Sequence, residues 1–274
     1  MKVTRNDVAY EVVTDGPASH LDFWQRYSSG SWEPETFRIF DAALGPDVTH
    51  VDFGAWIGPT ALYAAHRAAR VYAFEPDPVA FEALTRNLAC NPHLAQVEVA
   101  NVAIALEPGT LRIGVHGEAG DSESSVLRGA CGHAWEVPAI RLDDFLRERG
   151  VTGRVFVKMD VEGYEYELLP DLLHALEPWD YLLYVATHPG LLSRGVPGTS
   201  WSAKLARRRA SVMPNLRLMR ALYRLPYLAG PDWRPLDPFG ALWRIVRHGG
   251  SLAPVDAVLV TNRPACWACI AARG

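Results

Sequence analysis

The sequence predicts an α/β protein built around a mostly parallel β-sheet, and three observations support this. Short apolar runs alternate with helix-like segments between residues 49 and 187, a pattern typical of strand–helix–strand units. A turn containing glycine, Asp52 to Gly58, follows the first apolar run. An acidic turn, Phe74 to Asp77, follows the second. Turns of this kind lie at the carboxyl ends of parallel strands, where open α/β sheets bind their ligands.

The elements of the core are expected in regular order. Strands are expected at Thr49–Phe53, Val71–Phe74, Val97–Asn101, Val155–Met159 and Tyr181–Thr187. Helices are expected at Pro59–Ala69, where proline occupies a tolerated first-turn position, and at Pro78–Ala89 and Tyr164–Leu176. Near the end of the chain, Ala257–Thr261 and Cys266–Ala271 flank a turn-forming segment, which predicts an antiparallel hairpin.

Two stretches interrupt the alternation. Residues 107–142 contain strand-like pieces, Thr110–Val115 and Val137–Leu142, around a loop rich in Gly and Ser, and we interpret them as an insertion over the ligand. Residues 201–248 are rich in Arg and Pro, which predicts short helices and turns outside the core. Residues 1–48 are expected to form an N-terminal cap packed on the main domain, residues 49–274, because unstructured loops of that length are uncommon.

Composition limits the class of protein. The chain has 274 residues, 49% of them hydrophobic, enough for one well-buried domain. A net charge of −4 argues against a nucleic-acid-binding protein. No apolar segment follows the first basic residues, and no apolar run approaches the roughly 20 residues that span a bilayer. We therefore expect a soluble, cytoplasmic protein with reduced thiols.

Two of the four cysteines, Cys266 and Cys269, are spaced as half a zinc site or a redox pair would be. No second pair is present, and the flanking residues resemble a strand, which would place the two sulfur atoms on opposite faces. A structural role is therefore favoured, and no metal ligand is assigned.

The turn after the first strand favours one nucleotide cofactor over another. Gly54 and Gly58 allow the backbone to pass close to a ligand. In the GxGxxG turn of dinucleotide enzymes the backbone amides bind a pyrophosphate, but here Trp56 replaces the second glycine. Asp52 adds a negative charge, which suits a ligand with an amino group and a sulfonium. The turn therefore predicts S-adenosylmethionine, with S-adenosylhomocysteine as product, rather than NAD.

Two further strand ends are candidates for contact with the nucleoside. Glu75 lies 21 positions after Gly54, and a carboxylate there can accept both hydroxyl protons of a ribose. Asp77 is expected to cap the following helix. Asn101 ends the third strand, where it either faces the adenine or serves as a turn residue.

Three motifs together resemble the FkbM family of methyltransferases. They are Asp52-x-Gly54-x-x-x-Gly58, Phe74-Glu75-Pro76, and the run from Val157 to Glu165 that reads Val-Lys-Met-Asp-Val-Glu-Gly-Tyr-Glu. The resemblance covers roughly residues 51 to 189, and the third motif is the most specific. It implies a Rossmann-like methyltransferase fold, with a mostly parallel seven-stranded sheet closed by a C-terminal antiparallel hairpin. It also implies S-adenosylmethionine as donor and hydroxyl acceptors on sugars, glycans or natural products.

Cofactor-binding residues are expected along these motifs and in two segments outside them. The motif residues are Asp52, Gly54, Ala55, Trp56, Gly58, Glu75, Pro76 and Asn101. The loop Ser122 to Ser125, with Ser124 and Ser125 as the expected contacts, and the segment Trp32 to Thr36, with Glu35 and Thr36, are expected to close over the methionine end. Ordinary loop and helix-capping roles are the alternative for both segments.

The sequence departs from the family at two positions. Trp56 stands where asparagine is common, which affects the shape around the methionine end of the cofactor. The family often carries Glu-x-His-Pro after the fifth strand, whereas this chain has Ala186-Thr187-His188-Pro189. A role that needs the missing carboxylate is therefore unsupported.

Catalytic candidates follow the fourth and fifth strands. Transfer to an alcohol needs a base, and His188, just past the fifth strand, has an ordinary pKa near neutrality. Asp160 and Glu162 lie at the same sheet edge and could orient His188, act as base, or bind a divalent ion with it. Lys158 shares a face with Asp160, so an ion pair is expected there. Glu165 and Glu167 are expected to be solvated helix positions.

Residues 201–248 also suggest an anionic partner. This segment contains ten basic residues and only two acidic residues, Asp232 and Asp237, so its net charge is +8. The rest of the chain then has a net charge of −12. Arginine binds phosphate or carboxylate in a bidentate manner, and the interleaved Leu and Tyr would suit an anionic membrane surface. We therefore expect a small-molecule or glycan acceptor that is anionic or lipid-linked, with peripheral membrane contact through 201–248. The alternative is a basic lid paired with the acidic core.

Absent motifs narrow the chemistry. No Asp/Asn-Pro-Pro-Tyr/Phe follows the fourth strand and no Pro-Cys is present, which disfavours methylation of amide or adenine nitrogen and of cytosine carbon. The sequence thus predicts an O-methyltransferase. A nicotinamide-dependent oxidoreductase and a non-catalytic ligand-binding module of the same fold stay open as alternatives.

Overall fold

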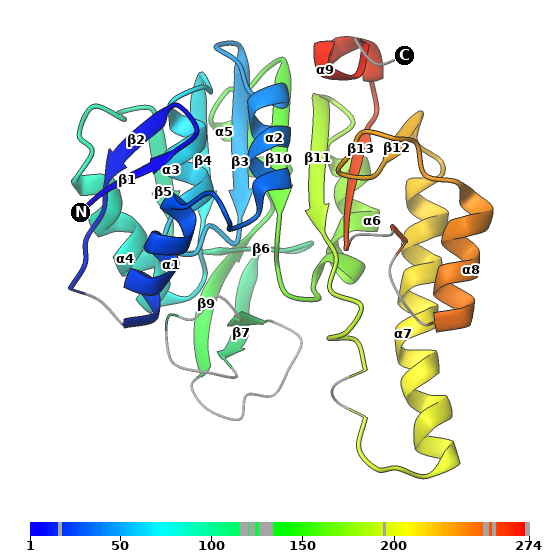
Figure 1. Cartoon of the computed structure of the whole chain (residues 1–274). Coiled ribbons are helices and arrows are strands. Elements are labelled where there is room, and N and C mark those ends of the chain that lie inside the picture. Colours follow the sequence, from blue (N-terminus) through cyan, green and yellow to red (C-terminus); the bar gives the residue numbers. More distant parts are fainter. Residues whose placement is uncertain are drawn as a thin grey trace.

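A seven-stranded sheet forms the centre of the molecule (Figure 1). The computed structural model describes residues 1–15, 18–115, 120, 124–125, 134–193, 196–248, 252–253 and 256–271. The strand order is β12-β13-β11-β10-β3-β4-β5. The strands span Val48–Phe53 (β3), Arg70–Phe74 (β4), Val97–Ala100 (β5), Arg154–Met159 (β10), Asp180–Ala186 (β11), Tyr227–Ala229 (β12) and Ala257–Thr261 (β13). The strands β11, β10, β3, β4 and β5 pair in parallel, whereas β13 runs antiparallel to both of its neighbours. The predicted Rossmann-like fold is confirmed.

Helices cover both faces of this sheet (Figure 1). They include α3 (Pro59–Ala65), α4 (Pro78–Ala89), α5 (Leu142–Glu148) and α6 (Glu165–Ala175). Side chains alternate between the faces, so on β10 Phe156 joins the apolar cluster under α3, whereas Val155 and Val157 join the cluster under α6. The predicted helix Pro78–Ala89 is confirmed at both ends. Asp77 caps its first turn, where its side chain accepts hydrogen bonds from the backbone N–H groups of Val79 and Ala80.

The N-terminal segment packs on the α3 face. It consists of β1 (Lys2–Arg5), β2 (Val8–Glu11), α1 (Ala18–Ser28) and α2 (Pro34–Ala43). Trp24, Tyr27 and Phe37 share one apolar cluster with α3. Arg5 is buried, lies 4.2 Å over the ring of Phe37 and donates to the carbonyl of Trp32. The segment that precedes the sheet in sequence thus forms part of the same apolar core.

The insertion after β5 forms its own small sheet beyond the carboxyl ends of the large one (Figure 1). Its order is β6-β9-β7-β8, from Ala103–Ile104 (β6), Gly109–Val115 (β7), Ser124–Ser125 (β8) and Ala134–Ile140 (β9). The two predicted strand pieces are therefore present, although Leu142 begins α5 instead of ending a strand. Ser122 lies outside the described residues, and only the backbone of Ser124 and Ser125 is described.

The predicted C-terminal hairpin is wrong in one strand. Cys266–Ala271 is not extended: a 3₁₀ turn, Pro264–Cys266, leads into a short helix, α9 (Ala268–Ala271). The partner of β13 is β12, which comes from within residues 201–248. Cys266 and Cys269 are free and half-buried, in a helical segment where the strand argument about their sulfur atoms does not apply.

Residues 201–248 contain longer regular secondary structure than predicted. In place of several short helices they form one of 22 residues, α7 (Trp201–Leu222), followed by β12 and by α8 (Pro238–His248). Pro214 lies inside α7, and Asn215 Nδ2 donates to the carbonyl of Ser211 at 3.0 Å next to it. Helix α7 projects past the carboxyl ends of the parallel strands (Figure 1). Within the part of the chain that the structure describes, no helix is both long and apolar enough to cross a membrane.

Candidate functional site

A cavity of about 890 Å³ opens at the carboxyl ends of β3, β4, β10 and β11. This volume lies at the upper end of the range for small-molecule sites. The wall also includes parts of α1, α2 and the small sheet. Ten of the residues predicted for the site lie in this wall: Glu35, Thr36, Gly54, Ala55, Trp56, Glu75, Pro76, Asp160, Glu162 and His188. The structure thus brings together residues that are up to 153 positions apart in sequence.

The two glycines of the first turn are needed because other parts of the chain lie too close to them for a side chain to fit. Gly54 has a φ of 72°, and a Cβ there would run into the carbonyl oxygen of Asp160. Gly58 has a φ of 95°, and its Cβ would lie 2.6 Å from Leu84 Cδ1. Gly58 does not line the cavity; its backbone conformation sets the start of helix α3, and its contact with the cofactor stays a prediction.

Asp52 lies beneath the cavity wall instead of in it. Lys158 is its register partner on β10, and the Lys158 ammonium lies 3.6 Å from Asp52 Oδ1. The other carboxylate oxygen, Oδ2, accepts a hydrogen bond of 2.6 Å from Thr60. The carboxylate therefore neutralises a buried lysine, and its direct contact with the cofactor stays a prediction.

Trp56 holds the turn in an unusual conformation. Its φ is 48°, a region that residues with a Cβ rarely adopt. Its backbone N–H donates to Glu75 at 2.7 Å, and its indole N–H donates to the carbonyl of Gly120 at 2.8 Å. The ring lies edge-on to Phe23 of α1 at 4.5 Å. Glu33 and Glu162, also in the cavity wall, have positive φ too, so three of the five described non-glycine residues with this backbone lie at the cavity.

The Glu75 carboxyl is buried and held by two backbone donors. Trp56 N–H and Asp77 N–H donate to its two oxygens at 2.7 and 2.8 Å. Burial raises the pKa of Glu75 to about 8, although both donors act in the opposite direction. Asn101 lies behind this turn and outside the cavity wall, because its amide donates to the carbonyls of Glu75 and Pro76. The turn role foreseen for Asn101 is therefore observed, and its contact with the adenine stays a prediction.

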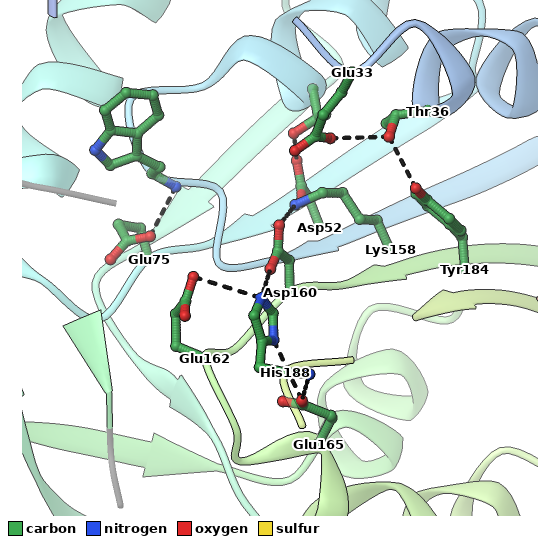
Figure 2. A network of polar contacts seen from close by, with 12 residues as sticks. Glu33, Thr36, Asp52, Glu75, Lys158, Asp160, Glu162, Glu165, Tyr184 and His188 are labelled. Atoms are coloured by element: carbon green, nitrogen blue, oxygen red, sulfur yellow. Dashed lines mark hydrogen bonds and ion pairs between the residues drawn. The ribbon is translucent and has the colours of Figure 1, made fainter. Parts of the chain in front are cut away.

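His188 lies among three carboxylates (Figure 2). Glu165 Oε1 accepts from the His188 backbone N–H at 2.7 Å and lies 3.2 Å from Nδ1. The opposite ring nitrogen, Nε2, faces Asp160 at 3.4 Å and Glu162 at 3.6 Å. Glu165 thus fixes the ring so that Nε2 points at the two acids in the cavity wall.

Glu165 is a site residue that the sequence prediction missed. It is fully buried, whereas we expected a solvated helix position; the same expectation for Glu167 is confirmed. Its second oxygen accepts from the backbone of Gly163 at 2.8 Å. The usable signal was its place in the first turn of a helix, where a carboxylate can bind free backbone N–H groups. The contact with His188 depends on the fold, because 23 residues separate the two.

The charges of this group set its protonation. Burial alone would lower the pKa of His188, but the Glu165 hydrogen bond and the charge of Asp160 raise it to about 9. Burial alone would raise the pKa of Asp160, but the Lys158 ammonium, 3.3 Å from its Oδ2, lowers the pKa below the ordinary value. At neutral pH the resting pair is therefore an imidazolium and a carboxylate. The predicted Lys158–Asp160 ion pair is confirmed, and the pKa of His188 lies above the ordinary value of histidine.

Asp160, Glu162 and His188 each offer one ligand atom within 4.8 Å of the others, a spacing that would also admit a divalent cation. The Lys158 ammonium already neutralises Asp160 from the other side. A cation would have to bind next to that positive charge, so the observed pairing favours proton chemistry over a metal centre.

A second chain of polar contacts connects α2 to β11 (Figure 2). Thr36 Oγ1 donates to Glu33 Oε2 at 2.9 Å and lies 2.9 Å from the hydroxyl of Tyr184. Glu33 and Tyr184, like Thr36, line the cavity. Neither was assigned to the site from the sequence, although Glu33 lies within the segment expected to close over the ligand.

The family model described as Methyltransferase FkbM domain matches residues 52–191, about half of the chain. This range contains the Gly54 turn, Glu75, Asp160 and His188, all of which line the cavity. The chain belongs to the FkbM family of methyltransferases. This confirms the resemblance seen in the sequence motifs.

Two relatives of this FkbM protein are described as methyltransferases. Hexuronic acid methyltransferase AglP of Haloferax volcanii is 29% identical over 185 residues, which cover 64% of this chain and 70% of AglP. Methyltransferase sdnD of Sordaria araneosa is 30% identical over 152 residues, which cover 43% of this chain and 58% of sdnD. Among solved structures, geranyl diphosphate C-methyltransferase from Streptomyces coelicolor A3(2) is similar with a TM-score of 0.41 and 12% identity, over 88% of this chain and 80% of that one.

S-adenosylmethionine is the cofactor of the enzyme, and the cavity fits it. Six carboxylic acids line the wall against Arg26, Lys158 and His188, which suits a ligand with a sulfonium and an amino group. Apolar walls for an adenosine come from Phe53, Phe74, Val102, Ile104 and Ile113. The acidic character predicted from Asp52 is thus present, but other carboxylates supply it at the cavity surface.

Proposed function

We propose that this methyltransferase transfers the methyl group to a hydroxyl oxygen of an anionic sugar or related natural product. The observation that carries the proposal is the Nε2 face of His188, which points with Asp160 and Glu162 into the cavity at the end of β11. An alcohol is a poor nucleophile, and a proton acceptor at this place supplies what it lacks. A neutral amine would need no such group.

In the proposed reaction, His188 accepts a proton and its neighbouring carboxylates position and stabilise it. S-adenosylmethionine supplies an electrophilic methyl group whose carbon–sulfur bond breaks as the oxygen–carbon bond forms. The neutral ring of His188 accepts the hydroxyl proton at Nε2, while Glu165 holds Nδ1. Asp160 and Glu162 stabilise the imidazolium that results. Because His188 is mainly protonated at neutral pH, the active fraction grows as the pH rises towards about 9.

The cofactor is proposed to bind across the first and second turns. The Gly54–Trp56 turn approaches the methionine portion, and the Glu75 carboxylate accepts hydrogen bonds from the ribose. Glu35 and Thr36 of α2 also line the cavity and are proposed to contact the methionine end. Ser124 and Ser125 stay predicted contacts of the same end.

The acceptor class is proposed from one side chain and one relative. Arg26 of α1 lines the cavity, and no ion pair engages its guanidinium among the residues that the structure describes. A guanidinium there can bind a carboxylate of the acceptor in a bidentate manner. The relative AglP is named as a hexuronic acid methyltransferase, and a hexuronic acid offers hydroxyl groups and a carboxylate together.

One observation favours a second candidate, methylation of the carboxylate of such an acid to an ester. The raised pKa of His188, about 9, gives an imidazolium that attracts an anionic acceptor, and a carboxylate needs no base. Against it, Asp160, Glu162 and Glu165 surround that imidazolium and repel a second carboxylate. The hydroxyl acceptor is therefore preferred.

The test is transfer of a labelled methyl group from S-adenosylmethionine to a panel of hexuronic acids and matched neutral hexoses. We expect label in hexuronic acids, in a form that survives mild alkali, because an ether resists saponification. Label released by alkali would establish the ester instead. Transfer to neutral hexoses at the same rate would contradict the role of Arg26, which Arg26→Gln tests directly. S-adenosylhomocysteine binding by calorimetry serves as the control for folding.

A further inference from the structure

Helices α7 and α8 carry a surface that the reaction does not use. They lie side by side at one end of the sheet (Figure 1), joined by the Arg208 hydrogen bond to the carbonyl of Val246. One face of each helix packs on the core through Leu218, Leu222, Ala241 and Ile245. The other faces are turned to solvent, and their composition is unusual.

Large apolar side chains are exposed almost only there. Among the residues that the structure describes, Met1 is the one large exposed apolar side chain outside α7 and α8. Phe239 is 83% exposed, Trp201 77% and Trp243 64%. The remaining four are Leu205, Met213, Leu242 and Val246. A concentration of this kind on a protein surface marks an interaction site.

The spacing makes these residues continuous stripes. On α8, residues 239, 242, 243 and 246 recur at the three- and four-residue intervals of one helix face, opposite the buried Ala241 and Ile245. On α7, the exposed positions Leu205, Arg209, Met213, Arg217 and Arg220 recur in the same way. We call these two stripes the docking face.

Among the residues that the structure describes, the charges around the docking face lack acidic partners in the core. Within the described ranges, no ion pair joins a basic residue of 201–248 to an acidic residue of the core, and Arg234 pairs with the adjacent Asp232. Arg207, Arg208 and Arg244 donate to backbone carbonyls of Gly198, Val246 and Leu252. The basic lid paired with the acidic core, which the sequence left open, is not what the described residues form. The excess positive charge is available to an anion outside the chain.

We propose that the docking face binds the surface of a bilayer containing anionic phospholipids. Exposed Trp and Phe on one helix face, next to Arg and Lys, are suited to insertion at the level of the headgroups. A second copy of the chain would bring two strongly basic surfaces together, and a nucleic acid would not use the apolar stripe of α8. An anionic membrane satisfies both the charge and the apolar side chains.

The position of the docking face relates it to the cavity. The loop from β11 to α7 begins with cavity residues, Pro189, Gly190 and Leu191, and reaches Trp201 ten residues after Leu191. Helix α7 projects on the side of the sheet where its parallel strands end, which is where the cavity lies (Figure 1). Docking through α7 would therefore hold the cavity near the headgroups.

Vesicle flotation with the full chain tests the proposal. We expect binding to phosphatidylcholine vesicles that contain phosphatidylglycerol, weaker binding at high salt, and little binding to phosphatidylcholine alone. Arg217→Gln with Arg220→Gln should weaken binding about fivefold per charge removed. Lys2→Gln with Arg70→Gln removes two exposed charges elsewhere and should change it little. Phe239→Ser with Trp243→Ser should lower binding while thermal melting and methyl transfer to a soluble acceptor are retained.

Each other occupant gives a distinct result. Equal binding to both kinds of vesicle, or none to either, would overturn the proposal. Self-association measured by sedimentation that Phe239→Ser with Trp243→Ser abolishes, without vesicle binding, would assign the face to a second copy. Salt-sensitive binding to RNA or DNA that this double variant leaves intact, again without vesicle binding, would assign it to nucleic acid. None of these outcomes bears on methyl transfer, so failure here is separable from failure of the proposed reaction.

Discussion

The carboxyl edge of the sheet and the α7–α8 pair treat charge in opposite ways. At the sheet edge, Lys158 is buried between Asp52 and Asp160, and His188 is held among three carboxylates. On α7 and α8, arginines stand in solvent beside exposed aromatic rings. At the sheet edge the charged side chains pair with one another, and these pairs fix the positions of Lys158, Asp160 and His188. Among the described residues, no ion pair links the arginines of α7 and α8 to an acid of the core, which leaves their charge available for contact with an anion outside the chain.

The largest effect is expected at the paired group. His188→Gln should lower turnover on a hydroxyl acceptor by about 10²–10⁴-fold, because the proton acceptor is lost. S-adenosylhomocysteine affinity, measured by calorimetry, should stay close to that of the wild type. His174→Gln, an exposed histidine on α6, is the matched control. Near-native turnover of His188→Gln across the neutral range would move the proton acceptor to Asp160 or Glu162.

The same substitution in the two regions sharpens the comparison. Lys158→Met leaves the fully buried Asp52 without its counter-charge and should destabilise the fold by about 3–5 kcal/mol. Lys204→Met, on the exposed face of α7, should change stability by less than about 0.5 kcal/mol. Urea denaturation monitored by circular dichroism gives both values. Similar losses in the two variants would show that burial does not distinguish these lysines.

Cofactor affinity should depend on one buried carboxyl. Glu75→Gln should weaken S-adenosylhomocysteine binding by about 1.5–3 kcal/mol, because one amide N–H must face a backbone donor and a charged acceptor is lost. In the wild type, affinity should rise as the pH increases through about 8, where Glu75 ionises, and then level off. The variant should lack this rise. Titration calorimetry over this pH range checks both points, and an unchanged affinity in Glu75→Gln would remove the ribose assignment.

Glu165 is a positioning residue, and its effect should appear in the pH profile. Because its hydrogen bond and charge help to raise the pKa of His188 to about 9, Glu165→Gln should lower that pKa by about one unit. The rise of turnover with pH should then occur at lower pH. Glu167→Gln, an exposed acid on the same helix, should leave the profile in place. A loss of turnover by the same factor at every pH would mean that Glu165 supports structure alone.

The smallest effect is expected from chelation. Treatment with EDTA should leave turnover unchanged, because the Lys158 ammonium already neutralises Asp160. The measurement is turnover before and after chelation, followed by addition of Mg²⁺ or Mn²⁺. Loss on chelation that either ion restores would make Asp160, Glu162 and His188 a metal site and would displace the proton-transfer proposal.

The strands and helices next to the cavity were predictable because local signals and the fold agree there. Pro78 with the Asp77 cap predicts the start of α4, and the apolar runs of β3, β4 and β10 are buried on both faces. Glu75, Asp160 and His188 each follow the end of a predicted parallel strand, which places them at the same edge of the sheet. In the structure, this edge forms most of the cavity wall.

The rest could not be predicted for identifiable reasons. Strand β12 has three residues between Pro226 and Gly230, too few to show a period. Helix α7 continues through Pro214, which in isolation predicts a break. The stretch from Cys266 to Ala271 is apolar enough for a strand but too short to distinguish one from a helical turn. Asp52 and Glu165 are both buried, because Asp52 pairs with Lys158 below the cavity wall and Glu165 is covered by the segment after β11.

The close approach of Gly54 to the Asp160 carbonyl has a consequence for how such enzymes diversify. The turn proposed to meet the donor and the loop that carries Asp160 leave neighbouring strands in fixed register, Phe53 opposite Met159. Hydrogen bonds of the sheet therefore fix the Gly54 turn relative to Asp160, which lies 3.4 Å from Nε2 of the proposed proton acceptor His188. Helices α1 and α2 and the small sheet, which also line the cavity, are not held by these strand pairings. Mutation can reshape them to accept new molecules while the reacting atoms keep their alignment.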